Sequence, residues 1–440
     1  MQNNSTALSH KRVLGVAIPI VLANATIPIL GAVDTAVVGQ LGLAVPIGAV
    51  GIGAIIITAI YWLFGFLRMG TTGLTAQAIG SGNKSETSAL LVRGIIIGVV
   101  AGLILIIAQV PVFLGALQLS PASIEVEDLA QKYLQIRVFS APAAIALFGI
   151  TGWLIAKEKT RAVLLLQLVL NGINIVLDLV FVLKLGWGVE GVAIATLIAE
   201  WSGLIFGLWL VREGFNNSYW KNWAQIFDRV RLVQMAKVNG DIMIRSILLE
   251  VGFVSFLFLG ASFNDATLAA NQILIQFLSI TVHALDGFAF AAETLVGQAL
   301  GAKNRPLFRR AVVMTSKWGL GTVVLMALSF FVFGNSIINI MTTAEDVRTV
   351  SYEYLPWIVV APIAGVAAWM LDGIFIGATR TADMRNMMFI SFCVYLIALA
   401  VLLPIYGNHG LWASLIIFSI ARGITLGFKY PALEASSGTN

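Results

Sequence analysis

Long apolar runs constrain this chain more than any other feature of its sequence. A helix needs about 20 apolar residues to cross a hydrocarbon core about 30 Å thick. Breaking the sequence at charges and at Gly, Pro and Asn clusters leaves twelve such runs. They lie at 13–38, 46–70, 90–114, 128–155, 162–183, 189–211, 232–259, 268–297, 308–334, 347–376, 385–405 and 409–428. We therefore predict an all-α integral membrane protein with twelve transmembrane helices.

The composition excludes several other classes of protein. Of the 440 residues, 59% are hydrophobic and only 11% are charged, whereas soluble domains have roughly 25% charged residues. A soluble enzyme, a disordered chain and a secreted disulfide scaffold are all excluded on this ground. The single cysteine, Cys393, allows no intrachain disulfide and argues against a cysteine metal site. The net charge of +5 is not gathered into a basic run, so we expect no nucleic-acid partner.

The positive charges predict how the chain is oriented. If both termini are cytoplasmic, most Lys and Arg residues fall in cytoplasmic segments, as the positive-inside rule requires. The predicted outer loops hold only Lys132, Lys184 and Arg348. We count Arg137, Arg245 and Lys317 inside the spans and assign all the other basic residues to the cytoplasmic side.

The sequence also repeats itself at an offset of 221 residues. The stretch TAQAIGSGNK after the second run matches VGQALGAKNR after the eighth, which pairs Gln77 with Gln298 and Gly80 with Gly301. Six spans in each half is an even number, so the halves share one orientation, and a cavity is expected between them. We predict two six-helix lobes related by pseudo-two-fold symmetry. Their bounds are 1–212 for the first lobe, 213–230 for a cytoplasmic connecting loop and 231–440 for the second lobe.

Polar residues of the first half gather at one depth in the predicted spans. An ionisable group there costs at least about 2.5 kcal/mol and by default indicates function. Asp34, Asp178 and Thr196 lie at similar depth below the outer surface, and Asn171, Asn174 and Asp178 share one helix face. Tyr133 and Arg137, one turn apart, lie slightly further out. Such a cluster suits a proton or a sodium ion, although the carboxylates could also merely hold helices together through neighbouring amides.

The second half carries further candidates. Asp286 and Glu293 share a face of one span, with His283 one turn from Asp286, and Asp372 lies nearer the cytoplasmic end of another. Asp286 and Asp372 could line a cavity or bind to helix ends. Asp241 and Arg245, four residues apart, are expected to form a structural ion pair. Glu200 and Glu250 have no partner that the sequence reveals.

The chain also resembles a known family. The segments LGAVDTAVVGQLG, NGINIVLDLVFV, GVAIATLIAEW, NGDIMIRSILL, HALDGFAFAAETLVGQALGA and LDGIFIGATRTADMRN resemble the multidrug and toxic compound extrusion (MATE) family, especially its DinF subfamily of bacterial inner-membrane transporters. The resemblance covers essentially the whole chain. It implies an antiporter with two six-helix lobes that exports cationic or amphipathic drugs by alternating access, without a cofactor, driven by H⁺ or Na⁺.

The resemblance also assigns roles to residues. It implies that Asp34 is the protonation site, with Asp178, Asn174, Thr196 and Tyr133 as its companions. The proline at which the first span bends falls on Pro19. A Na⁺ ion could be held by Asp34, Asn174, Asp178 and Thr196, and a contribution of the second lobe through Asp372 stays open. We expect a monomer in the bacterial inner membrane, surrounded by lipid.

Three rival functions remain to be weighed. A lipid-linked oligosaccharide flippase should carry unpaired intramembrane arginines for a pyrophosphate, whereas carboxylates dominate here. An intramembrane enzyme would need a His/Glu metal motif or a Ser/His dyad, and the three histidines offer neither. A passive channel is disfavoured by the duplicated halves, which are typical of alternating access.

Overall fold

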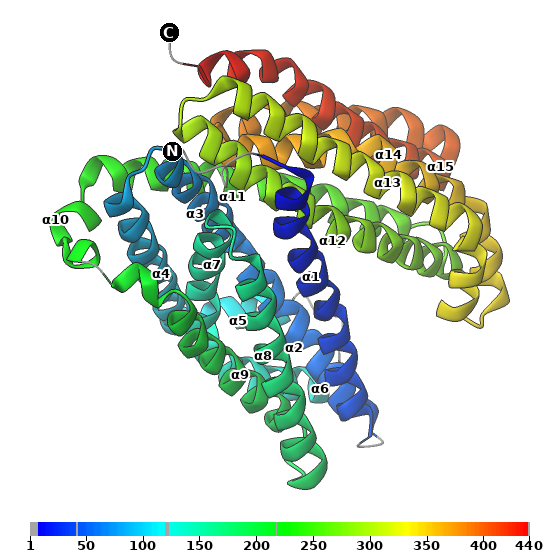
Figure 1. Cartoon of the computed structure of the whole chain (residues 1–440). Helices are drawn as coiled ribbons and strands as arrows, with labels where there is room; N and C mark the ends of the chain where they lie inside the picture. The colour runs from blue at the N-terminus through cyan, green and yellow to red at the C-terminus, as the bar shows by residue number, and fades with distance from the viewer. Residues whose placement is uncertain (1–7, 41–42, 119–122, 217, 439–440) are drawn as a thin grey trace. The chain divides into compact units, whose positions relative to one another are not determined.

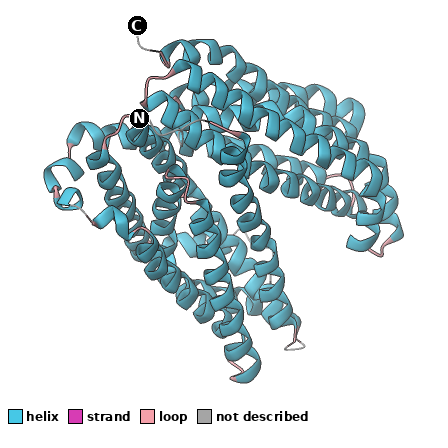
Figure 2. Ribbon diagram, in the orientation of Figure 1, coloured by secondary structure: helices cyan, strands magenta, loops and turns pink. Residues whose placement is uncertain are grey.

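The structure is a computed structural model of the chain, and it describes residues 8–40, 43–118, 123–216 and 218–438. Over these residues the fold is helical, with no strand (Figures 1 and 2). The helices are α1 (His10–Gly39), α2 (Ala44–Leu63), α3 (Gly65–Gly80), α4 (Lys84–Ile107), α5 (Gln109–Leu117), α6 (Ile124–Arg137), α7 (Ala141–Ala156), α8 (Thr160–Asp178), α9 (Gly188–Leu210), α10 (Trp223–Ile226), α11 (Arg229–Gly260), α12 (Asp265–Gly301), α13 (Arg305–Met341), α14 (Glu345–Gly377) and α15 (Thr381–Ser436).

The long helices confirm the predicted membrane spans. Among the described residues, 11 helices are long and apolar enough to cross a membrane. The last of them, α15, holds two predicted spans, 385–405 and 409–428. Gly407 separates the two, because its φ of 54° interrupts the helical geometry and lies in a region that glycine enters without steric cost. The twelve predicted spans therefore fall on these 11 helices.

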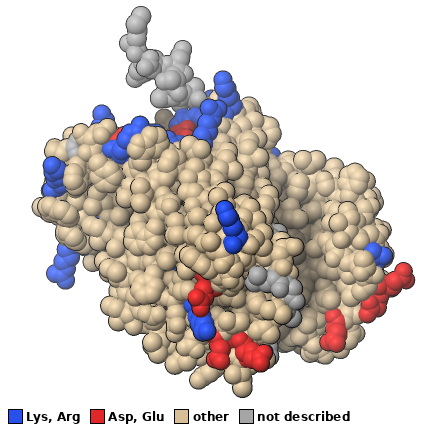
Figure 3. Space-filling model, turned by 90° about the horizontal axis from the view of Figure 1, so that it is seen from below, with Lys and Arg blue, Asp and Glu red and all other residues tan. Residues whose placement is uncertain are grey.

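Much of the surface is apolar, as a membrane protein requires. Large hydrophobic side chains such as Ile107, Phe331 and Ile340 are exposed on α4 and α13. The face drawn in Figure 3 is formed largely by uncharged residues, with few Lys, Arg, Asp or Glu side chains. Soluble monomers rarely expose apolar patches of more than a few hundred square ångströms. These side chains are therefore placed to contact lipid.

The helices pack into two compact units. One unit comprises Met1–Val21, Ala76–Gly82 and Gln234–Asn440, and the other comprises Leu22–Thr75 and Asn83–Val233. The first part of α1 and the end of α3 thus pack with the second half of the sequence. The lobe boundaries predicted from the sequence stay a prediction.

In the unit that contains Leu22–Thr75, small residues let α4 and α7 approach closely. A Cβ added at Gly98 would lie 2.5 Å from Cα of Ala146, and one added at Gly102 would lie 2.2 Å from the backbone nitrogen of Pro142. Close backbone approach through small residues is typical of helix packing in membranes. The neighbouring core is built around Trp153, whose indole N–H donates to the backbone oxygen of Thr87 at 2.9 Å.

In the other unit, α11, α12, α14 and α15 enclose an aromatic core that includes Phe256, Phe277 and Trp412. A polar pair is embedded in it. The amides of Asn271 and Asn408 donate to each other at 2.8 and 3.0 Å, and the indole of Trp412 donates to Asn271 at 2.9 Å. These buried polar groups are hydrogen-bonded, which offsets the cost of burying them, and the bonds hold α12 and α15 together.

The sequence repeat is also present in local structure. A Cβ on Gly80 would lie 2.0 Å from the backbone oxygen of Gln298, and a Cβ on Gly301 would lie 2.1 Å from the backbone oxygen of Gln77. The two copies of the duplicated motif therefore contact each other reciprocally, glycine against backbone. Positive φ angles recur at the same offset as well, at Gly82 and Lys303 and at Glu158 and Thr379.

Candidate functional site

The centre of the site is an amide that bridges two carboxylates. In the orientation of the Asn174 side chain that satisfies all its partners, its nitrogen donates to Oδ1 of Asp34 and to Oδ2 of Asp178, each at 3.1 Å. Its oxygen accepts from the hydroxyl of Thr196 at 3.0 Å. Helices α1, α8 and α9 supply these residues, which all belong to the unit that contains Leu22–Thr75. The predicted cluster is thus brought together.

Helix α8 is shaped around this site. Asn171, Asn174 and Asp178 follow each other at spacings of three and four residues and are all buried, so they form its inner face. Directly after Asp178 the chain changes to a π-helix over Leu179–Lys184, in which the amide of Leu185 donates to the carbonyl of Val180 at 2.9 Å. Such a π-turn is uncommon and is often found at functional sites.

The two carboxylates differ in burial. Asp178 is fully buried, and its Oδ1 has no hydrogen-bond partner among the described residues, whereas Asp34 is half-buried. They lie close enough to act on each other electrostatically, and Arg137 is the cation that acts on both. A buried carboxylate oxygen without a donor is costly while the group is charged. The arrangement therefore favours a cation or a proton at this point.

Arg137 is held by a partner that sequence reasoning missed. Its guanidinium binds Glu200 of α9 through two hydrogen bonds of 2.9 and 3.1 Å, and both side chains are largely buried. The backbone oxygen of Arg137 accepts from the Tyr61 hydroxyl at 3.0 Å. Glu200 lies one turn after Thr196 on the same helix face, a spacing that could have pointed to it.

Tyr133 and Asn171 flank the cluster. Tyr133 is buried against α2, where its ring occupies the space that a Cβ on Gly53 would need, and it lies within reach of Arg137 and Asp34. The Asn171 amide donates to the Thr26 hydroxyl of α1 at 2.9 Å and accepts from Gln167 at 2.9 Å. Asn171 thus links α8 to α1 one turn away from the bridge at Asn174.

The structure corrects the expected pairing of Asp241 with Arg245. Asp241 accepts from Arg385 at 2.5 Å and from the Thr381 hydroxyl at 3.0 Å, both on α15. Arg245 instead forms an ion pair with Asp372 of α14. The spacing of four residues places Asp241 and Arg245 on one helix face, but partners on neighbouring helices approach each of them more closely.

Asp372 is shared by two arginines. Besides Arg245, the buried Arg422 donates to the same oxygen, Oδ2, at 2.6 Å. We expected Arg422, near the end of the predicted span 409–428, at the cytoplasmic side, whereas the structure buries its side chain against Asp372 of α14. One carboxylate among two guanidinium groups leaves this cluster with an excess positive charge, in contrast to the carboxylate pair at Asp34 and Asp178.

The remaining candidates lie on α12 and α11. Glu293 is buried, and its backbone oxygen lies 2.3 Å from the position of a Cβ on Gly377, so α12 and α14 are in close contact there. Asp286 is half-buried, one turn after His283, whose ring nitrogen lies 2.7 Å from the backbone oxygen of Ser279. Glu250 is exposed. None of these lies in the Asn174 cluster.

The second half lacks an equivalent acidic pair. At the offset of 221 residues, Ser255, Tyr395 and Leu399 stand where the first half has Asp34, Asn174 and Asp178. Ser255 and Tyr395 are again in contact, with their hydroxyl oxygens 2.9 Å apart. The duplicated fold therefore preserves the position of the contact, but only the first copy places carboxylates in it.

A hard cation could be held by oxygen atoms of Asp34, Asp178 and Thr196. The Asn174 amide oxygen joins this set if that group is rotated. Among residues 8–40, 43–118, 123–216 and 218–438, no group of three or more His, Cys, Asp or Glu side chains could hold a metal ion. Membrane-crossing helices around a buried ionisable cluster define a class: a multi-pass helical membrane protein built for transport.

Comparison with known proteins gives the family. The MatE family model matches residues 19–180 and 242–402. DNA damage-inducible protein F of Escherichia coli (strain K12) is 37% identical over 424 residues, covering 95% of this chain and 91% of that protein. The probable multidrug resistance protein NorM of Bacillus anthracis is 24% identical, and the match covers 96% of this chain and 95% of that protein.

Solved structures agree on the fold. The Vibrio cholerae MATE transporter VcmN in the bent form matches with a TM-score of 0.83 at 23% identity over 97% of both chains. A MATE structure in the straight conformation matches with a TM-score of 0.87 at 19% identity over 97% of this chain and 96% of that one. The chain belongs to the MatE family, and its identity to protein F places it with the DinF members.

Membership of this family decides the kind of activity. Its members are transporters and not enzymes, and the protein is a MATE-family multidrug efflux transporter that needs no cofactor. Transporters of the family handle small-molecule drugs and organic cations. The chain is a multi-pass membrane protein.

Proposed function

We propose that the protein exports cationic and amphipathic drugs by proton antiport, with Asp34 and Asp178 as the coupling pair. The observation that carries this proposal is the Asn174 amide bridging the two carboxylates inside the spans. Arg137 cannot neutralise them, because its charge is already matched by Glu200. With both aspartates ionised, the site would carry two uncompensated negative charges, which burial strongly disfavours.

A shared proton fits the hydrogen bonds of this site. With the Asn174 nitrogen toward both carboxylates and its oxygen toward Thr196, the amide has a partner at each end. In this arrangement the Asn174 N–H groups supply the donors that two carboxylates with one shared proton require. With the amide turned over, its nitrogen donates to Thr196 at 3.0 Å and its oxygen faces the carboxylates. That orientation suits the alternative, sodium coupling through Asp34, Asn174, Asp178 and Thr196.

Bending of α1 at Pro19 is the conformational step in this proposal. A proline inside a helix leaves a carbonyl without its intrahelical partner and favours a bend. Helix α1 belongs to both packing units, and the division falls after Val21, two residues beyond Pro19. Protonation of Asp34 changes its hydrogen bonds to Asn174 on α8. This change moves the part of α1 beyond Pro19. Tyr133 and Thr196 flank the groups that rearrange.

Competition between proton and substrate provides the coupling. A cationic drug is attracted to the unprotonated carboxylates, and protonation removes that attraction, so each ligand lowers the affinity for the other. We also propose that the protein works as a monomer in the bacterial inner membrane by alternating access between its two predicted lobes, with both termini cytoplasmic. Of the other candidates, Asn171 positions α8, and Asp286 and Glu293 are to be tested as lining residues.

A reconstitution experiment tests the coupling ion. Liposomes that contain the protein are loaded with a cationic dye. A pH gradient and a sodium gradient are then imposed in separate experiments. Dye movement against its gradient under the pH gradient alone is expected. Movement driven by sodium in the absence of a pH gradient would overturn the proton assignment.

Variants then test the residues. Asp34→Asn and Asp178→Asn should abolish pH-driven dye movement, while Asp128→Asn, an exposed aspartate on α6, should keep it and serves as the matched control. Thermal unfolding in detergent shows that the aspartate variants are folded. If Asp34→Asn moves dye at the wild-type rate, the mechanism is wrong.

A further inference from the structure

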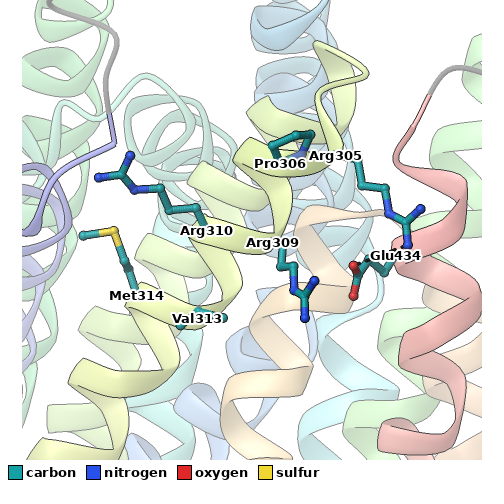
Figure 4. A pocket seen from close by; sticks show the side chains of 7 residues that line it. All are labelled: Arg305, Pro306, Arg309, Arg310, Val313, Met314 and Glu434. Carbon is teal, nitrogen blue, oxygen red and sulfur yellow. Dashed lines mark ion pairs between the residues drawn. The ribbon is translucent and has the colours of Figure 1, made fainter.

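A cavity lies outside the Asn174 cluster, at the beginning of α13. It has a volume of about 570 Å³ and is lined by Arg305, Pro306, Arg309, Arg310, Val313, Met314 and Glu434. Figure 4 shows that Arg305 and Arg309 extend toward Glu434 of α15, whereas Arg310 extends to the other side of α13. The proposed transport mechanism makes no use of these residues.

The charges of this cavity suit an anion. Arg305 and Arg309 extend toward one carboxylate, and Glu434 is 3.5 Å from Arg305. Arg309 is exposed and has no ion-pair partner among the described residues. Its guanidinium group therefore remains available on the Glu434 side of α13, and a guanidinium group binds phosphate oxygens through paired hydrogen bonds.

The cavity continues into an apolar stripe. Along α13 from Val313, exposed apolar side chains recur at helical spacing on the same face: Leu320, Val324, Leu328 and Phe331. A ligand that contacts both parts needs an anionic head and a long apolar tail. The orientation predicted from Lys and Arg residues places this end of α13 at the cytoplasmic side, where basic pockets between transmembrane helices bind acidic lipid head groups.

We propose that this cavity between the start of α13 and the end of α15 binds an anionic phospholipid. Arg309 receives the phosphate, and the acyl chains lie along the stripe from Val313 to Phe331. Arg305 stays with Glu434 and closes one side of the cavity. Free phosphate shares the head-group chemistry, but it makes no use of the apolar stripe.

Binding to purified protein in detergent tests this proposal. Dioleoyl phosphatidylglycerol, dioleoyl phosphatidylcholine and inorganic phosphate are titrated separately, and bound lipid is counted by native mass spectrometry. The full chain is compared with Arg309→Gln. A charge-matched control is Lys84→Gln, which removes one exposed basic residue from the start of α4.

One phosphatidylglycerol molecule should bind tightly to the wild type, and phosphatidylcholine should bind weakly. The arginine variant should lose about fivefold in affinity, since a basic residue adds roughly fivefold for an acidic lipid. The control should change by less than about twofold. An equal loss in both variants would show general electrostatic attraction and overturn the site, and inorganic phosphate displacing the lipid at equal concentration would overturn the lipid assignment. Dye export in liposomes confirms that each variant is folded.

Discussion

The two arginines that share Asp372 allow a sharp test of buried charge in this protein. Arg245 and Arg422 both donate to Oδ2 of Asp372, and the exposed fractions of the Asp372 and Arg422 side chains are 8% and 3%. Replacing Asp372 with Asn leaves two buried guanidinium groups without a counter-charge. Removing one member of a buried ion pair costs about 3–5 kcal/mol, so Asp372→Asn should lose at least that much.

For a unit of this size, such a loss corresponds to about 10–15 °C in the melting temperature. We would follow thermal unfolding in detergent by intrinsic fluorescence. Asp265→Asn, an exposed aspartate in the first turn of α12, is the control and should change the melting temperature by about 2 °C or less. The triple variant Arg245→Met/Asp372→Leu/Arg422→Met should recover most of the loss, because apolar residues of similar size replace buried ions well.

Two outcomes would refute this reasoning. If Asp372→Asn melts within about 2 °C of the wild type, the three charges do not stabilise the fold. If the triple variant is as unstable as the single one, the loss does not come from the uncompensated arginines. The same variants test whether Asp372 takes part in coupling. If Asp372 only compensates the charge of the two arginines, the triple variant should export dye with the same proton dependence as the wild type.

Three further predictions follow from local geometry. Glu200→Gln should destabilise the protein by about 3–5 kcal/mol, and combining it with Arg137→Gln should recover part of that loss in thermal unfolding. Gly98→Ala should lower the melting temperature, because its Cβ would lie 2.5 Å from Ala146, whereas Gly172→Ala, with open space around it, should raise stability by up to about 1 kcal/mol. Partial burial would raise the pKa of Glu213, but hydrogen bonds from two lysines hold the pKa of that carboxyl below its ordinary value. Its stabilisation is thus present at neutral pH and lost as the pH falls through the lowered pKa, so hydrogen exchange around Glu213 should accelerate in acid.

The sequence was sufficient where one helix determines the arrangement. The spacing of Asn171, Asn174 and Asp178 predicted a shared inner face of α8, and all three are buried on it. Apolar runs predicted the spans because a hydrocarbon environment leaves few alternatives for the backbone. The constant offset of 221 residues pointed to the paired motifs that contain Gly80 and Gly301, and these two glycines make matching contacts.

The sequence was insufficient where partners come from different helices. Glu200 and Arg137 are 63 residues apart, and no local spacing connects them. Asp241 and Arg245 have the spacing of an ion pair within a helix, yet helix packing supplies each with a closer partner. Pairwise side-chain choice depends on how helices are rotated against each other, which periodicity alone does not determine.

The reciprocal contact at Gly80 and Gly301 has a consequence for the origin of the chain. Each glycine meets the backbone of the other copy's glutamine, so this surface is complementary to itself, as in an isologous dimer. A half-length ancestor carrying one copy could have paired with a second molecule through the same contact. Fusion would then have freed the two halves to diverge, so that one now carries the aspartates and the other Ser255 and Leu399.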